Sequence, residues 1–185
     1  MKYLRVTALF VVVSILSPLR AGTYNLAAEY SAGTGSSAAT IVVDFGLEAY
    51  AFTYNWDGTA TGWDALNAID QAGELDAIAI DYGSWGMYIY ALLYQDAAIY
   101  NYGTGVTQGW AYFSSENGSD WYTTDGVSFR NLVNGSWDAY VWSNYDFTVS
   151  WDPLRQPGQS PLPVPEPATL LLAGLGAAVL KRRIV

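Results

Sequence analysis

The sequence predicts an α+β domain in which a strand-rich sheet packs with one main helix. Residues 22–152 hold all eight tryptophans and fourteen of the fifteen tyrosines, and this aromatic density favours pleated sheet. A single segment has apolar residues at helical spacing, whereas most of the rest consists of short alternating runs punctuated by glycine-containing turns. We therefore expect one layered domain with one core.

The earliest strand signal lies in residues 40–56, "TIVVDFGLEAYAFTYNW". The segment is rich in β-branched and aromatic residues, and its second half alternates large side chains with small ones. Gly46 interrupts the run. The segment predicts one long strand or a hairpin broken at Gly46.

The helix is predicted in the segment "TGWDALNAIDQAG", where the apolar residues recur at helical spacing. Thr61 can cap the first turn, and Asp64 three positions later completes a capping box. Gly73 then ends the helix. The runs that follow predict short strands, with tight turns at Asn117-Gly118 and Asn134-Gly135.

Residues 1–21 have the three parts of a secretory signal peptide. Lys2 and Arg5 form a basic start, an apolar run extends from Val6 to Leu16, and small residues follow near Ala21. We expect the secretion machinery to export the chain and the leader to be removed. The exported α+β domain is then predicted to span residues 22–152.

The composition excludes several classes of protein. The chain has no cysteine and no histidine, which removes thiolate zinc sites, cysteine nucleophiles and Ser-His triads. Between residues 22 and 164 two arginines stand against sixteen Asp and Glu residues, a formal charge of −14. Such a surface repels a phosphate backbone, so no nucleic-acid partner is expected.

The C-terminal residues predict a linker and a hydrophobic segment. Residues 153–164 are rich in Pro, Gly, Gln and Ser, which is typical of an extended linker. The uncharged run Ala168–Leu180 follows. As a helix it would extend about 20 Å, short of the roughly 30 Å hydrocarbon core of a bilayer. The cations Lys181, Arg182 and Arg183 would stay on the cytoplasmic side.

Residues 165–185 resemble the bacterial PEP-CTERM sorting signal. The resemblance rests on Val164, the triplet Pro165-Glu166-Pro167, the short apolar helix and the three terminal cations. It implies recognition by an exosortase, a membrane-embedded protease, after transient insertion of the helix in the membrane. It also implies delivery to the cell surface or to an exopolysaccharide matrix. The alternative is a plain C-terminal anchor that remains uncut.

Part of the central domain resembles the small extracellular domain at the C-terminus of transcobalamin-like proteins. The segments that carry the likeness are "GWDALNAI", "GWAYFSSENG" and "LVNGSWDAYVW". The resemblance implies a β-grasp-like sheet. No residue pattern here specifies a corrin ligand, so we extend only the fold, and we expect no cofactor.

Carboxylates are the remaining groups that support catalysis, and three pairs are spaced suggestively: Asp64 with Asp70, Asp76 with Asp81, and Asp120 with Asp125. A glycosidase needs two carboxylates at a defined separation, which sequence spacing does not establish. "WDGTATG" and "TTDGVS" each offer oxygen ligands, but an Asp that caps its own turn explains both. We expect neither an enzyme nor a metal site.

The aromatic residues are the other functional candidates. Trp110, Trp121 and Trp137 adjoin glycine or polar turn residues, so they are the rings we would expect to be exposed. Exposed rings stack against sugars or planar ligands, whereas buried rings only fill the core. The sequence thus leaves two alternatives: a non-enzymatic structural protein of the cell surface or matrix, or a module that binds glycans or small ligands and has exopolysaccharide as a partner.

Overall fold

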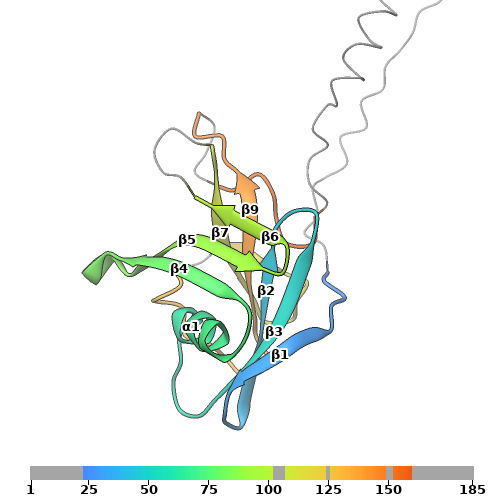
Figure 1. The fold of residues 1–185 in the computed structure, drawn as a ribbon, viewed down its shortest axis with the longest axis vertical. Helices are drawn as coiled ribbons and strands as arrows, with labels where there is room; N and C mark the ends of the chain where they lie inside the picture. The colour runs from blue at the N-terminus through green and yellow to red at the C-terminus, as the bar shows by residue number, and fades with distance from the viewer. Residues whose placement is uncertain (1–22, 102–106, 124–125, 149–151, 160–185) are drawn as a thin grey trace, which may run out of the picture.

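The computed structural model describes residues 23–101, 107–123, 126–148 and 152–159, and it contains two sheets and one α-helix (Figure 1). The predicted signal peptide and the predicted sorting segment 165–185 lie outside the described residues. Within the described ranges, no helix is long and apolar enough to span a membrane. The strand-rich α+β architecture predicted from the sequence is confirmed.

The larger sheet has six strands in the order β1-β3-β2-β9-β7-β8. Strands β2 and β3 pair antiparallel, and β9 lies parallel to β2 in the middle of the sheet. Strand β7 pairs antiparallel with β9 and β8. The bounds of these strands are β1 Ala28–Gly33, β2 Ser37–Asp44, β3 Ala49–Trp56, β7 Gln108–Ser115, β8 Tyr122–Thr123 and β9 Trp137–Asn144.

Of the two alternatives predicted for residues 40–56, the structure has the hairpin, formed by β2 and β3. Their register runs from Ser37 opposite Trp56 to Asp44 opposite Ala49. The turn is closed by the Phe45 amide, which donates to the Glu48 carbonyl at 2.9 Å, and Gly46 has a φ of 107°. Glycine is favoured there because other residues rarely adopt a positive φ.

Strand β1 was not predicted, and it pairs in parallel with β3 at the edge of the sheet. Its sequence, AEYSAG, contains small and polar residues and one aromatic ring. It lacks the β-branched enrichment and the clear alternation that mark a strand. Its place depends on pairing with β3 and on packing against the helix.

The predicted helix is confirmed as α1, Gly62–Ala72. Thr61 Oγ1 accepts from the Asp64 amide, and the Asp64 carboxylate accepts from the Thr61 amide at 2.7 Å, so the capping box is formed. The helix stops before Gly73 and buries Ala65, Leu66 and Ile69. It packs against β1, β3 and β4.

The second sheet is antiparallel, with the order β4-β5-β6, whereas the sequence led us to expect a single sheet. Its strands are β4 Asp76–Asp81, β5 Met87–Tyr94 and β6 Ala97–Tyr100, and the short 3-10 helix η1, Gly83–Trp85, joins β4 to β5. Local alternation predicts strands but not which strands pair, because pairing depends on long-range packing.

Both faces of the larger sheet are covered, which explains the continuous buried run Ile41-Val42-Val43 in β2. On one face the core includes Phe52, Leu66, Ile69, Leu92 and Tyr140, contributed by both sheets and the helix. On the other face Val42 packs with a second cluster: Ala51, Ala111, Phe113, Trp121, Ala139 and Val141.

The start of the predicted linker lies against the domain. Pro153 forms a bridge with Tyr145, and the Leu154 amide donates to the Asn144 carbonyl at 2.8 Å. Arg155 is buried with 6% of its surface exposed. The described residues 152–159 therefore continue the fold past the predicted boundary at 152, because hydrogen bonds and a buried charge hold them there. The rest of the predicted linker lies outside the described residues.

Candidate functional site

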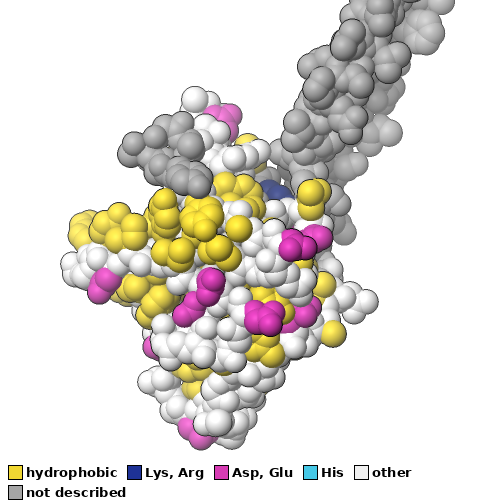
Figure 2. Space-filling model, viewed as in Figure 1, with side chains coloured by type: hydrophobic (Ala, Val, Ile, Leu, Met, Phe, Trp, Pro, Cys, Tyr) yellow, Lys and Arg dark blue, Asp and Glu magenta, His cyan; other side chains and the backbone are white. Residues whose placement is uncertain are grey.

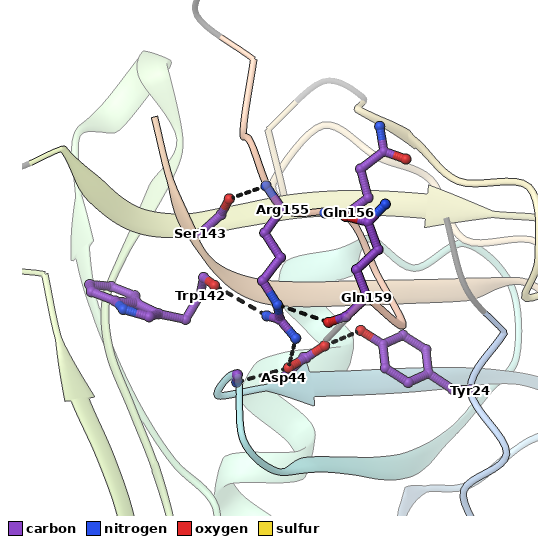
Figure 3. Close-up of polar contacts among 8 residues, drawn as sticks. Tyr24, Asp44, Trp142, Ser143, Arg155, Gln156 and Gln159 are labelled. Carbon is purple, nitrogen blue, oxygen red and sulfur yellow. Dashed lines mark hydrogen bonds and ion pairs between the residues drawn. The ribbon is translucent and has the colours of Figure 1, made fainter. Parts of the chain in front are cut away.

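A buried ion pair joins the C-terminal segment to the end of β2 (Figure 3). Arg155 Nη2 lies 2.5 Å from Asp44 Oδ1, and both side chains are almost fully buried. Asp44 also accepts from the Tyr24 hydroxyl at 2.5 Å and from the Gly46 amide at 2.9 Å. Burial, and then the Asp44 charge, raise the pKa of the Tyr24 hydroxyl above its ordinary value, so this hydroxyl stays protonated and acts as a donor.

Arg155 also donates to two backbone carbonyls and to a serine hydroxyl. Its Nε donates to the Gln159 carbonyl at 3.1 Å and its Nη1 to the Trp142 carbonyl at 3.2 Å, while its amide donates to Ser143 Oγ at 2.8 Å (Figure 3). A buried guanidinium that bonds through each of its three nitrogens holds the segment against the sheet. This cluster therefore acts as a structural clamp.

A second buried carboxylate, Asp138 of β9, lies beneath the first turn of α1. The Tyr112 hydroxyl donates to its Oδ2, and Arg130 Nε lies 3.7 Å from its Oδ1. Both Asp138 Oδ1 and Arg130 Nε are buried and have no hydrogen-bond partner. Burial raises the pKa of Asp138 from 3.8 to about 6, although Tyr112 and Arg130 oppose the shift.

Gly62, the first residue of α1, makes this approach possible. A side chain there would bring its Cβ into collision with the Tyr112 hydroxyl and to 3.0 Å from Asp138 Oδ2. The Gly62 carbonyl also accepts from the Tyr140 hydroxyl at 3.2 Å. The helix N-terminus, Tyr112, Tyr140 and Asp138 thus form one interior polar cluster.

Two pockets lie on either side of Tyr122, whose side chain is 66% exposed. The larger, about 340 Å³, is lined by Trp121, Tyr122, Asp152 and Gln156 among others. The smaller, about 250 Å³, is lined by Glu116, Asn117, Asp120, Tyr122, Arg130 and two serines. An aromatic ring flanked by carboxylate, amide and hydroxyl groups is suited to bind a polar, ring-containing ligand.

The loop between β7 and β8 shapes the smaller pocket. Asn117 Oδ1 accepts from the amides of Ser119 and Asp120, each at 2.9 Å, and Ser115 Oγ accepts from the Gly118 amide at 2.9 Å. Gly118 has a φ of 72°, and a Cβ at this position would lie 2.9 Å from the Trp137 ring. The turn predicted at Asn117-Gly118 therefore covers Trp137, one of the three tryptophans that we expected to be exposed.

The three tryptophans that we expected to be exposed, Trp110, Trp121 and Trp137, do not form a row of exposed rings. Trp121 is buried with 8% exposed, and it packs in the same cluster as the half-buried Trp137. Trp110 is half-buried on the opposite face of the sheet, edge-on to Phe45 and Trp142 at 5.4 Å. Of these three tryptophans, only Trp121 lines one of the two pockets described above.

The most exposed tryptophan among the described residues is one that the sequence did not predict to be exposed. Trp85 has 86% of its surface exposed, and the neighbouring Tyr82 has 56% exposed. The sequence feature that indicates its exposure is the position of Trp85 between two turn glycines, Gly83 and Gly86. That pattern indicates a protruding tip more directly than proximity to a single glycine does.

The carboxylates considered for catalysis mostly bind nearby backbone or side-chain groups. Asp64 caps α1, Asp70 accepts from the Ala77 amide at 2.7 Å, and Asp81 accepts from the Gly83 amide at 2.7 Å. Asp120 accepts from Asn117 Nδ2 at 2.7 Å, and Asp125 lies outside the described residues. Within the described part of the chain, no group of three acidic, His or Cys side chains is arranged to hold a metal ion.

Of the two predicted turn motifs with oxygen ligands, "WDGTATG" is described. Its Asp57 accepts from both the amide and the hydroxyl of Ser36, at 3.0 and 2.9 Å, and these bonds hold the pKa of Asp57 below its usual value. A carboxylate used in this way closes a turn. In "TTDGVS", residues 124–125 lie outside the described ranges.

Comparison with known proteins identifies the C-terminal end of the chain. A comparison with curated proteins found no match. Among protein-family models, the PEP-CTERM protein-sorting motif matches residues 163–183, a range that includes the Pro165-Glu166-Pro167 triplet and the cations Lys181, Arg182 and Arg183. The chain therefore carries a PEP-CTERM sorting motif, which implies an exported, envelope-associated protein that an exosortase recognises.

Proposed function

We propose that this protein has a non-enzymatic, structural role at the cell surface or in an exopolysaccharide matrix, after an exosortase has removed its C-terminal segment. The observation that carries this proposal is the sorting motif at residues 163–183. The leader expected at residues 1–21 supports the same route, because export precedes recognition of a C-terminal sorting signal in the envelope.

The non-enzymatic part of the proposal is supported by how the domain uses its charged groups. The chain has no histidine or cysteine, and the carboxylates Asp44 and Asp138 are each paired with an arginine in the interior. Asp64, Asp70 and Asp81 bind backbone amides. These roles favour a stable exported domain over a reacting centre.

Mass spectrometry of the protein isolated from its native host tests the processing. We expect the mature protein to lack both Met1 and the cluster Lys181–Arg183, and to be recovered from the surface or matrix fraction. Replacing Pro165, Glu166 and Pro167 by alanine should leave the C-terminal peptide in place. The matched control Pro161→Ala, outside the matched range, should be processed normally. An intact C-terminal peptide on the wild-type protein would instead indicate a permanent anchor.

The second candidate function is a module that binds glycans or small ligands, and the pockets beside Tyr122 favour it. Their lining combines aromatic, carboxylate and amide groups, the groups that fix a sugar ring. Tyr122→Ala should reduce retention of the protein on the host's exopolysaccharide without changing its melting temperature. Equal retention of variant and wild type would show that these pockets do not bind the polymer.

A further inference from the structure

An apolar surface covers the hairpin formed by β4 and β5. Of the eleven large apolar side chains exposed in the described residues, five lie on this hairpin: Ile78 (44% exposed), Ile80 (40%), Tyr82 (56%), Trp85 (86%) and Tyr88 (38%). We call these five residues the hairpin platform. Figure 2 shows hydrophobic side chains gathered over β4, β5 and β6.

The platform belongs to the outer face of the second sheet. Ile80 lies directly opposite Tyr88 in the β4–β5 register, and paired residues of neighbouring strands project from the same face. The rings of Tyr82 and Tyr88 are 6.1 Å apart. The inner face of the same sheet instead contributes Ile89 and Leu92 to the core.

Hydrogen bonds hold the tip of the hairpin, although Trp85 itself is exposed. The Tyr82 amide donates to the Gly86 carbonyl at 3.0 Å, and the Asp81 carboxylate accepts from the Gly83 amide at 2.7 Å. At the start of β5, the Met87 amide donates to Ser128 Oγ at 2.8 Å. Because the backbone of the tip is already ordered, binding there costs less entropy.

The charges near the platform restrict what it can bind. Asp76 and Asp81 are exposed on β4, and the platform contains no cation. Within the described residues, the two cations Arg130 and Arg155 pair with the buried Asp138 and Asp44. An anionic polymer or an anionic lipid surface would therefore be repelled, and a second copy of the chain would bring the same carboxylates.

We propose that the hairpin platform binds an uncharged polysaccharide. Aromatic rings stack against the C–H faces of sugar rings. Asp76 lies on the same face of β4 as Ile78 and Ile80 by strand alternation, and its carboxylate accepts hydrogen bonds from hydroxyl groups without requiring a charge on the ligand. The platform lines neither pocket beside Tyr122, which suits an extended chain better than a small molecule. This inference rests on the second candidate function and assigns it a different surface.

Each platform binds weakly, and many copies displayed on one surface reinforce one another. Trp85 is the residue expected to contribute most, since large aromatic side chains carry a disproportionate share of the binding energy at interfaces. Replacement by phenylalanine keeps a ring at this position, whereas replacement by alanine removes it.

The test measures retention of the exported protein, isolated from its native host, on insoluble cellulose, chitin and β-1,3-glucan, with alginate as an anionic comparison. We expect retention on at least one uncharged polymer and none on alginate. Trp85→Ala should weaken that retention about tenfold or more, and Trp85→Phe should keep most of it. The control Leu47→Ala, which truncates a side chain with 92% exposed on the β2–β3 turn, should bind like wild type.

Several outcomes would overturn the proposal: no retention of the wild type on any uncharged polymer, equal retention on alginate, or normal retention of Trp85→Ala. A wild-type dimer that Trp85→Ala converts to a monomer in size-exclusion chromatography would assign the platform to self-association. If Tyr122→Ala abolishes retention while Trp85→Ala does not, glycan binding stands and the platform is the wrong surface. The mass-spectrometric test of processing is independent of all these results.

Discussion

Arg155 and Asp44 are separated by 111 residues in the chain, yet Arg155 Nη2 lies 2.5 Å from Asp44 Oδ1 in the interior. The pair connects the end of β2 to a segment whose composition suggests a linker. As a result, the folded domain extends at least to Gln159, whose carbonyl accepts from Arg155 Nε. Few residues separate this point from the sorting motif, which begins at residue 163.

Removing the charge of one partner of this ion pair should lower the unfolding free energy strongly. Asp44→Asn leaves the Arg155 guanidinium buried without its counter-charge, and the expected loss is about 3–5 kcal/mol of unfolding free energy. Urea denaturation of the exported protein measures it. The exposed Asp57→Asn should change stability far less, and the double variant Asp44→Asn with Arg155→Met should recover part of the loss. An Asp44→Asn variant as stable as wild type would contradict the clamp.

Asp138 should make stability depend on pH in a defined window. Burial raises its pKa from 3.8 to about 6 in the folded protein, so the folded state binds the proton more tightly than the unfolded state does. The stability that this proton contributes is present below about pH 4 and is lost as the pH rises through about 6. The loss amounts to up to about 3 kcal/mol.

The measurement is the unfolding free energy of wild type minus that of Asp138→Asn, taken at intervals from pH 3.5 to pH 7.5. Because the other carboxylates titrate in both proteins, the difference isolates Asp138. We expect the difference to fall between about pH 4 and pH 6. A difference that rises over this range would mean that Arg130 and Tyr112 outweigh desolvation and hold the pKa low.

The capping box of α1 offers a smaller, local test. Thr61→Ala removes the side-chain oxygen that accepts from the Asp64 amide, and the expected cost is about 1 kcal/mol. Thr59→Ala, an exposed threonine two residues before the cap, serves as the control. Thermal unfolding followed by circular dichroism distinguishes them, and equal melting temperatures would show that the cap contributes nothing to global stability.

Replacing a buried tryptophan should reduce the unfolding free energy much more than replacing an exposed one. Trp121→Ala removes a ring that is 92% buried, since 8% of its surface is exposed, and should destabilise the domain by about 3–5 kcal/mol. Trp85→Ala should change the unfolding free energy by no more than about 0.5 kcal/mol, as expected for an exposed site. Chemical denaturation of both variants checks the contrast. A strongly destabilised Trp85→Ala would mean that this ring packs within the fold.

The sequence by itself determined the features that depend on local chemistry. Thr61, Asp64 and Gly73 define both ends of the helix, because capping involves neighbouring backbone groups. Gly46 marked the place where the strand signal breaks, because glycine adopts turn conformations easily, but it left a hairpin and one long strand as alternatives. The sorting motif was recognised because its triplet, apolar run and cations form one contiguous pattern.

Only the tertiary structure decided how distant segments meet. Alternation in β4, β5 and β6 predicts strands, but their separation into a second sheet depends on which long-range pairing buries more apolar surface. Trp121 is buried because it packs against the larger sheet, whereas Trp85 is exposed at the tip of the β4–β5 hairpin, although both residues stand beside turn residues in the sequence. The Asp44–Arg155 contact depends on the arrangement of β2 and β9, because a charge is stably buried only where the fold supplies its partner.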